Sequence, residues 1–173
     1  MRTIKKVASH IFIDGFGGMT QGLFATLIIG TMIQQIGLLI GGSTGNVIYL
    51  LGKAAAALTS AGIGVGVAVK YGESPLVTVS AAVAAMVGGY AGKITGGTFF
   101  VDGNAVLAGP GEPLGAFIAA FAGITCGHLV SGKTKVDIIV TPVITIGAGS
   151  VVGLLVGPPI SQMMTCLLYT SDA

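Results

Sequence analysis

Residues 16–39 read FGGMTQGLFATLIIGTMIQQIGLL, a long stretch without a single charged side chain. A transmembrane helix needs about 20 mostly apolar residues, because the hydrocarbon core of a bilayer is about 30 Å thick. A helix is the expected conformation, since it satisfies its own backbone hydrogen bonds where no water is present. We therefore predict a transmembrane helix over this stretch.

The composition of the whole chain agrees with a membrane protein. Of its 173 residues, 53% are hydrophobic and only 8% are charged, and the mean hydropathy is +0.94. Soluble domains carry roughly 25% charged residues, because their surface must face water. This chain cannot cover a water-soluble surface, so we predict an all-α polytopic membrane protein.

Four further apolar stretches raise the predicted number of transmembrane helices to about five. They run from about Val47 to Val69, from Pro75 to about Ala91, from Pro113 to about Val130, and from Asp137 to the Pro158–Pro159 pair. Proline suits the first position of a helix and aspartate suits an N-cap, which agrees with Pro75, Pro113 and Asp137 at the starts. Pro142 lies inside the last stretch, where a proline bends or breaks a helix.

The distribution of basic residues predicts how the chain is oriented. Lysine and arginine accumulate in the short cytoplasmic loops of membrane proteins. With the N-terminus inside, the predicted outer segments hold only Lys93, and the inner segments hold Arg2, Lys5, Lys6, Lys70, Lys133 and Lys135. We therefore predict a cytoplasmic N-terminus.

Residues 127–134, GHLVSGKT, match the phosphate-loop pattern G-x-x-x-x-G-K-[ST] letter by letter. That motif binds nucleotide phosphates only where a strand precedes it and a helix follows. Here an apolar helix pattern precedes the motif, and Pro142 follows shortly after Thr134, where a phosphate-loop helix would continue. We interpret the stretch as the cytoplasmic end of a helix followed by a basic loop.

No other motif in the sequence points to self-contained chemistry. The sequence shows no constellation of serine, histidine and acid, no cluster with the spacing of metal ligands, and no basic patch typical of nucleic-acid binding. We therefore predict no catalytic residue in this chain, no metal or other cofactor, and no nucleic-acid partner.

The segment between the third and fourth predicted helices, residues 93–113, reads KITGGTFFVDGNAVLAGPGEP. It is too polar and too rich in glycine to cross a membrane, yet it carries two apolar runs, 99–101 and 105–107. Irregular backbone persists at membrane depth only where protein or a wet cavity satisfies its polar groups. We interpret the segment as re-entrant; a compact extracellular loop with an apolar underside is the alternative.

Four polar or charged residues are candidates for binding a substrate. Asp102, Asn104 and Glu112 lie in this segment, and carboxylate and amide oxygens hydrogen-bond the hydroxyl groups of sugars. Lys53 lies within the second predicted helix, where a charge costs about 2.5 to 3.5 kcal/mol at the helix centre, so it is a candidate for a pathway or binding role. The alternatives are a solvated loop for the first three residues and a side chain that reaches back to the interface for Lys53.

Several longer stretches together resemble a known family of bacterial membrane proteins. They are FIDGFGGMTQGLFATLIIGTMIQQIG (12–37), GPGEPLGAFIAA (109–120), LVSGKTKVDIIVTPVITI (129–146) and VGLLVGPPISQMM (152–164). The family is the membrane-spanning C component (EIIC) of the phosphoenolpyruvate-dependent sugar phosphotransferase system, with relatives described as perfringolysin O regulators. The resemblance covers about residues 7–164.

The resemblance implies a function in group translocation. In that process the membrane component binds an external carbohydrate and moves it across the inner membrane, and a phosphorylated B component transfers phosphate to it. The partners implied are a carbohydrate, the A and B components, the lipid bilayer and, in the complete protein, a second copy in a homodimer. Any enzymatic role would be that of a membrane subunit. The alternative within the family is a membrane-embedded regulator or sensor without transport.

The resemblance also implies a division of the chain. Members of the family have about ten transmembrane helices, so residues 1–164 are expected to form the N-terminal half of an EIIC-like membrane domain. Residues 165–173, TCLLYTSDA, depart from the family pattern after SQMM and are expected to be a non-native tail. The resemblance places most of the sugar-binding residues in the other half.

Overall fold

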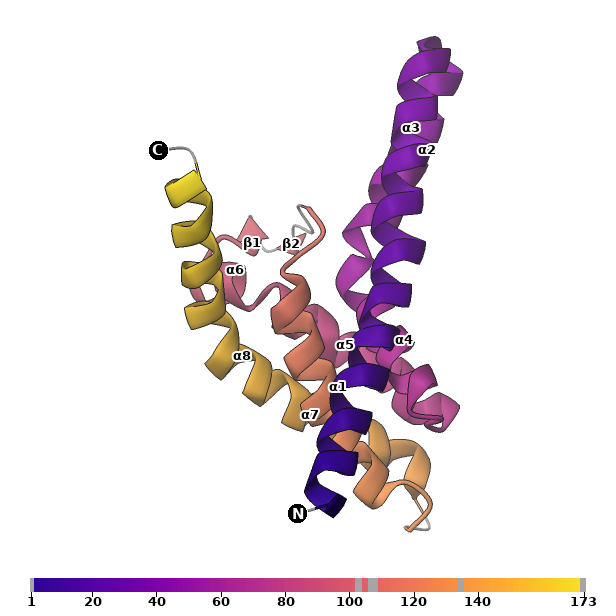
Figure 1. Ribbon diagram of the computed structural model, residues 1–173. Coiled ribbons are helices and arrows are strands. Elements are labelled where there is room, and N and C mark those ends of the chain that lie inside the picture. The colour runs from indigo at the N-terminus through magenta and orange to yellow at the C-terminus, as the bar shows by residue number, and fades with distance from the viewer. Residues whose placement is uncertain (1, 102–103, 106–108, 134–135, 172–173) are drawn as a thin grey trace.

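The computed structural model describes residues 2–101, 104–105, 109–133 and 136–171, most of which are helical (Figure 1). The helices are α1 (Arg2–Leu23), α2 (Ile29–Ile40), α3 (Gly42–Ala57), α4 (Thr59–Lys70), α5 (Pro75–Gly89), α6 (Ala91–Thr95), α7 (Pro113–Val130) and α8 (Asp137–Ser171). A π-helical turn, η1 (Phe24–Ile28), joins α1 to α2. Two short strands, β1 (Phe100–Val101) and β2 (Asn104–Ala105), pair antiparallel.

Three helical segments are long and apolar enough to cross a membrane, namely Ile13–Ile40, Pro113–Val130 and Asp137–Cys166. A fourth crossing results if α3 and α4, which meet at a bend of 52°, count as one broken span. Helix α5 is apolar, but its 15 residues are fewer than the roughly 20 that a bilayer requires. The predicted class, an all-α polytopic membrane protein, is confirmed, and the described residues provide three to four spans, so the predicted count of about five is approximate.

Helix α5 lies at the centre of the helical body, in contact with α4, α7 and α8. Its buried side chains include Ala81 and Ala85, which are small enough to let neighbouring helices approach closely. They pack with Ile63 and Val67 of α4 and with Ile124 of α7 in one apolar cluster. Small and β-branched side chains therefore form the core that holds the surrounding elements.

Glycines hold α1 against α4. Gly18 and Gly22 are four residues apart in the sequence, as are Gly62 and Gly66, and small residues at this spacing let helices approach closely. A Cβ on Gly18 would lie 2.5 Å from the carbonyl oxygen of Gly66, and a Cβ on Gly22 would overlap the backbone of Gly62. Gly41 behaves differently, because it has a φ of +64°, lies in the turn between α2 and α3, and has open space where a Cβ would be. Gly41 therefore serves the turn and not the packing of the helices.

Helices α2 and α3 form a hairpin that extends beyond the rest of the body (Figure 1). The residues buried between them are mostly glycines, with Gly30 and Gly37 on α2 and Gly45 and Gly52 on α3. Large apolar side chains cover the outside of the hairpin, and Leu39 is 86% exposed. An apolar exterior of this kind suits the hydrocarbon of a bilayer.

The second predicted span is not one helix, because it breaks at Leu58 into α3 and α4. Leu58 has a ψ of 10°, outside the helical region, and the side chains of Thr59 and Ser60 behind it are fully buried. The Thr59 hydroxyl donates a hydrogen bond to the carbonyl oxygen of Ala56 at 2.6 Å. Such local side-chain bonds compensate the backbone groups that a break in a helix releases.

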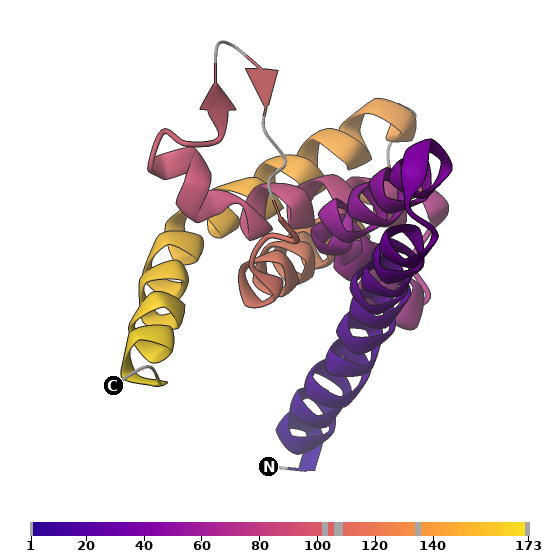
Figure 2. The same cartoon turned by 90° about the horizontal axis from the view of Figure 1, so that it is seen from above.

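The last predicted helix does not end at the Pro158–Pro159 pair, because α8 continues to Ser171. A proline has a φ that a helix accepts, and what it removes is a hydrogen bond to the preceding turn. Helix α8 contains Pro142 as well, and it is bent in both views of the molecule (Figures 1 and 2). The prolines of this stretch therefore lie inside a bent helix and do not mark its end.

The stretch GHLVSGKT begins inside α7, which ends at Val130, so a helix and not a strand precedes the turn. Gly132 forms that turn with a φ of +77°. Asp137 starts α8, and its Oδ1 accepts hydrogen bonds from the Gly132 N–H at 3.0 Å and from the Thr141 hydroxyl at 2.6 Å. Residues 134–135 lie outside the described part of the chain. The helix end predicted for this stretch is confirmed up to residue 133.

Candidate functional site

The segment predicted to be re-entrant leads into α7 through the loop 109–112. Gly109 and Gly111 have φ values of +83° and +72°, which side chains other than glycine rarely allow. The backbone N–H of Glu112 donates to the carbonyl oxygen of Gly89, at the end of α5, at 2.7 Å. Glu112 is therefore held at a defined place directly before the first turn of α7.

A buried tyrosine and a buried serine fix the same loop to the break between α3 and α4. The Tyr90 side chain is 1% exposed, and its hydroxyl lies within hydrogen-bond distance of the carbonyl oxygens of Ala57, at 3.1 Å, and Gly109. Burial raises the pKa of Tyr90 above its ordinary value of 10.0, so the hydroxyl stays protonated and acts as a hydrogen-bond donor. The Ser60 hydroxyl donates to the carbonyl oxygen of Pro110 at 3.0 Å. The position of the loop therefore depends on the broken helix.

A pocket of about 220 Å³ lies against this loop, and we call it the Glu112 pocket. Its lining comes from the end of α5, from α6, from the loop and from α8, and consists of Gly89, Gly92, Lys93, Gly109, Pro110, Gly111, Glu112 and Ser161. The Lys93 ammonium lies 5.3 Å from the centre of the Tyr90 ring. A carboxylate, an ammonium and a hydroxyl therefore border one small space, and together they can accept and donate hydrogen bonds to a polar ligand.

The Glu112 carboxylate is accessible to such a ligand. Its residue is partly exposed, and among the residues that the structure describes no hydrogen bond or ion pair engages this carboxylate. An ionised carboxylate accepts hydrogen bonds only, so its natural partners are hydroxyl and amine protons. In the described ranges, no group of three or more His, Cys, Asp and Glu side chains is placed to hold a metal ion.

The described structure brings one of the four predicted binding residues to this pocket. Glu112 lines it. Asn104 is exposed in β2 and Lys53 is exposed on α3, and neither is among the lining residues. Asp102 lies outside the described residues. A binding role stays a prediction for all four.

Phe99, in the segment between α5 and α7, packs against the buried Tyr90 at the end of α5. The rings of Phe99 and Tyr90 lie 5.6 Å apart, centre to centre. Next to them, β1 and β2 pair Phe100 with Ala105 and Val101 with Asn104. This inward packing agrees both with a re-entrant segment and with a loop that has an apolar underside.

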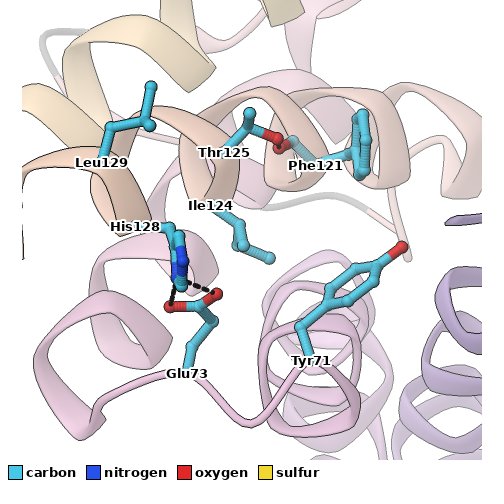
Figure 3. A pocket seen from close by; sticks show the side chains of 7 residues that line it. All are labelled: Tyr71, Glu73, Phe121, Ile124, Thr125, His128 and Leu129. Atoms are coloured by element: carbon cyan, nitrogen blue, oxygen red, sulfur yellow. Dashed lines mark hydrogen bonds and ion pairs between the residues drawn. The ribbon is translucent and has the colours of Figure 1, made fainter. Parts of the chain in front are cut away.

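A second pocket, of about 370 Å³, lies between the α4–α5 connection and the last turns of α7 (Figure 3). We call it the Glu73 pocket, and its lining consists of Tyr71, Glu73, Phe121, Ile124, Thr125, His128 and Leu129. The His128 Nδ1 lies 2.9 Å and 3.2 Å from the two carboxylate oxygens of Glu73. The Glu73 side chain is 9% exposed and the His128 side chain 72%, so the carboxylate belongs to the wall and the imidazole to the mouth.

Sequence reasoning missed the residues that reach these pockets from distant parts of the chain. Ser161 is far from Glu112 in the sequence, but it comes one turn after Gly157, which packs against Ala91 at the start of α6. Gly149, Gly153 and Gly157 follow one another at four-residue intervals in the sequence, and this spacing is a signal for a close helix approach. Glu73 had no such signal, because an acidic residue in a turn between helices is ordinary.

The long apolar helices are those of an α-helical membrane protein. Its two small pockets are lined by charged and hydroxyl-bearing residues and have room for small polar ligands. Residues 13–170 match the family described as Phosphotransferase system, EIIC. The chain belongs to this family, and the resemblance seen in the sequence is confirmed. No curated protein and no solved structure matches the chain significantly.

Proposed function

We propose that this protein is the sugar-permease component of a phosphotransferase system, which moves a carbohydrate across the bacterial inner membrane while a partner phosphorylates it. Its family makes it a membrane component related to sugar transport. The observation that carries the finer proposal is the Glu112 pocket, where acceptor and donor groups converge at the start of an apolar helix. Binding sites for small polar ligands have this form, with a few placed polar groups in an otherwise apolar frame.

The proposed task of this chain is to hold the sugar, and the phosphoryl group comes from a partner. The Glu112 carboxylate accepts hydrogen bonds from sugar hydroxyls, and the Lys93 ammonium and the Ser161 hydroxyl donate to sugar oxygens. A phosphorylated B component, charged by an A component, supplies the phosphate. The protein acts as a homodimer in the lipid bilayer. Asp102, Asn104 and Lys53 are proposed as further contacts along the path of the sugar.

The proposed orientation places the N-terminus in the cytoplasm. The start of α1, the α4–α5 connection and the turn after α7 lie at one end of the molecule, and the tip of the α2–α3 hairpin lies at the other (Figure 1). This arrangement supports a topology in which Lys70 and Lys133 share the cytoplasmic side with the N-terminus. The boundary between a membrane domain, 1–164, and a non-native tail, 165–173, stays a prediction.

Reconstitution tests the proposed transport directly. The protein is placed in vesicles loaded with A and B components and phosphoenolpyruvate, and a panel of radiolabelled hexoses and disaccharides is added outside. We expect at least one sugar to accumulate as its phosphate, and only when phosphoenolpyruvate is present. Uptake of unmodified sugar without phosphoenolpyruvate would contradict group translocation. Sugar binding without any uptake would favour the alternative, a membrane-embedded sensor or regulator.

A further inference from the structure

The Glu73 pocket is unexplained by sugar transport, and its position suits a ligand with an apolar tail. It lies beside the end of α7, which is apolar and long enough to cross a membrane. Leu129 lines the pocket and is 59% exposed, and Val69, at the end of α4, is 63% exposed. The pocket is within the size range of small-ligand sites. A chain attached to a ligand in this pocket would find apolar side chains next to it.

The carboxylate of Glu73 makes the pocket selective for a cation. It is held in the wall at low exposure, where a charge requires a partner of opposite sign. His128 is the partner in the described structure, but an imidazole carries a positive charge only when protonated. A carboxylate offers about four acceptor sites, so one ring nitrogen leaves most of them for other donors. A primary ammonium, with three N–H donors and a positive charge at neutral pH, satisfies this group more completely.

The aromatic side chains of the pocket add attraction for the same kind of ligand. The rings of Tyr71 and Phe121 lie 6.2 Å apart, centre to centre, on the side of the pocket away from Glu73, with Ile124 between them and the Glu73–His128 pair (Figure 3). Aromatic faces attract cations through their negative potential. They accept methylated and unmethylated ammonium groups alike, whereas hydrogen bonds to Glu73 require N–H donors. The carboxylate therefore selects a primary ammonium over a quaternary one.

We propose that the Glu73 pocket binds the headgroup of a membrane phospholipid that carries ethanolamine. The ammonium binds Glu73 and faces the two aromatic rings across the pocket. His128, exposed at the mouth, turns away from Glu73 and donates a hydrogen bond to the phosphate of the same headgroup. One acidic and one basic side chain thus match the two charges of one zwitterion. The acyl chains follow the exposed apolar surface beside Leu129 and Val69.

Native mass spectrometry of the purified, delipidated chain in detergent tests this proposal. The probes are dioleoyl phosphatidylethanolamine, its N-methyl and N,N-dimethyl forms, and dioleoyl phosphatidylcholine, which share identical acyl chains. We expect affinity to fall stepwise along this series, by about tenfold in total, because each methyl group removes an N–H donor to a charged acceptor. Equal affinity for the four lipids would overturn the proposal.

Two variants with the same change in charge locate the site. Glu73→Gln should abolish the preference for ethanolamine, whereas Glu112→Gln, in the other pocket, should leave it intact. A preference that survives Glu73→Gln would overturn the proposal, and if that variant does not fold, the lipid series on the unmodified chain still decides. Soluble glycerophosphoethanolamine should not displace the bound lipid at equal concentration. Displacement by it would mean that the ligand is a soluble metabolite and not a lipid.

Discussion

Among single residues, Tyr90 connects the loop of the Glu112 pocket to the broken helix. Its hydroxyl is positioned to bond the carbonyl oxygens of Ala57 and Gly109, which belong to the broken helix and to the loop before α7. The Tyr90 hydroxyl has one proton for these two carbonyl oxygens, so its hydrogen bond can switch from one oxygen to the other. A change in the position of the break at Leu58 would therefore change the position of the loop that carries Glu112.

Replacing Tyr90 with phenylalanine should destabilise the protein by about 0.5–1.5 kcal/mol, because it removes the hydroxyl that donates to the partly exposed carbonyl groups of Ala57 and Gly109. The change keeps the ring and its packing against Phe99, so the loss is that of the hydroxyl alone. Tyr49→Phe, on α3 and partly exposed, is the matched control and should change stability by less than about 0.5 kcal/mol. Reversible unfolding in mixed micelles, followed by circular dichroism, measures both. Equal losses in the two variants would contradict the role given to Tyr90.

Glu112→Gln should weaken sugar binding by the protein about tenfold. The variant keeps the size of the side chain and removes its charge, and hydrogen bonds to ionised groups are roughly twice as strong as neutral ones. Isothermal titration with the sugar identified by the transport assay measures the effect. Glu73→Gln, which makes the same change in the other pocket, should bind sugar normally. Unchanged binding by Glu112→Gln would reduce this residue to a structural part of the loop.

The candidate site could be predicted only in part, because sequence shows local chemistry and not distant neighbours. Glu112 was found from the loop GPGEP, whose glycines and prolines indicate an irregular turn before a helix. Its neighbours Lys93 and Ser161 come from α6 and α8, and only the packing of those helices brings them to the loop. The pairing of Glu73 with His128 likewise joins two elements that the sequence does not relate.

At the scale of the helices, the contact between α1 and α4 depends on glycines that have no room for a side chain. A methyl group at position 22 would overlap the backbone of Gly62, and neither backbone can move without separating the two helices. Gly22→Ala should therefore destabilise the protein by about 1–3 kcal/mol, as overpacking does.

A second glycine provides the control for this prediction. Gly147 lies inside α8, and a methyl group added to it would have nothing within 4 Å, so Gly147→Ala should be neutral or stabilising by up to about 1 kcal/mol. Both variants gain the same helix propensity and differ only in the space around the methyl group. Thermal unfolding in detergent compares them. A stabilised Gly22→Ala variant would show that α1 and α4 are not packed as described.

The helices themselves were largely predictable, because long apolar runs and prolines at helix starts are local signals. Pro75 and Pro113 begin α5 and α7 as predicted, and Ser74 accepts a hydrogen bond from the Val77 N–H as an N-cap. The break at Leu58 was not predictable, since no proline marks it and part of its compensation comes from Tyr90, far along the chain. The end of α8 was misjudged because a proline inside a helix and a proline after a helix look alike in a sequence.

For the molecule as a whole, its orientation in the membrane determines which side of the membrane each pocket faces. The Glu73 pocket adjoins the α4–α5 connection, at the same end as the start of α1 (Figure 1). The Glu112 pocket is formed by the segment between α5 and α7, next to the β-ribbon. With a cytoplasmic N-terminus, the lipid site lies in the inner leaflet and the sugar site is reached from outside.

Labelling of single cysteines tests this orientation across the whole molecule. Cys126 and Cys166 are first replaced by alanine, and then Ser43→Cys or Lys133→Cys is introduced, both at exposed positions. Ser43 lies near the tip of the α2–α3 hairpin, so a membrane-impermeant maleimide should label Ser43→Cys in intact spheroplasts. Lys133→Cys, in the turn after α7, should react only after the membrane is opened, because inner loops hold most of the basic residues. The reverse labelling pattern would show that the N-terminus is external. The Glu112 pocket would then lie on the cytoplasmic side, where it could not bind an external sugar.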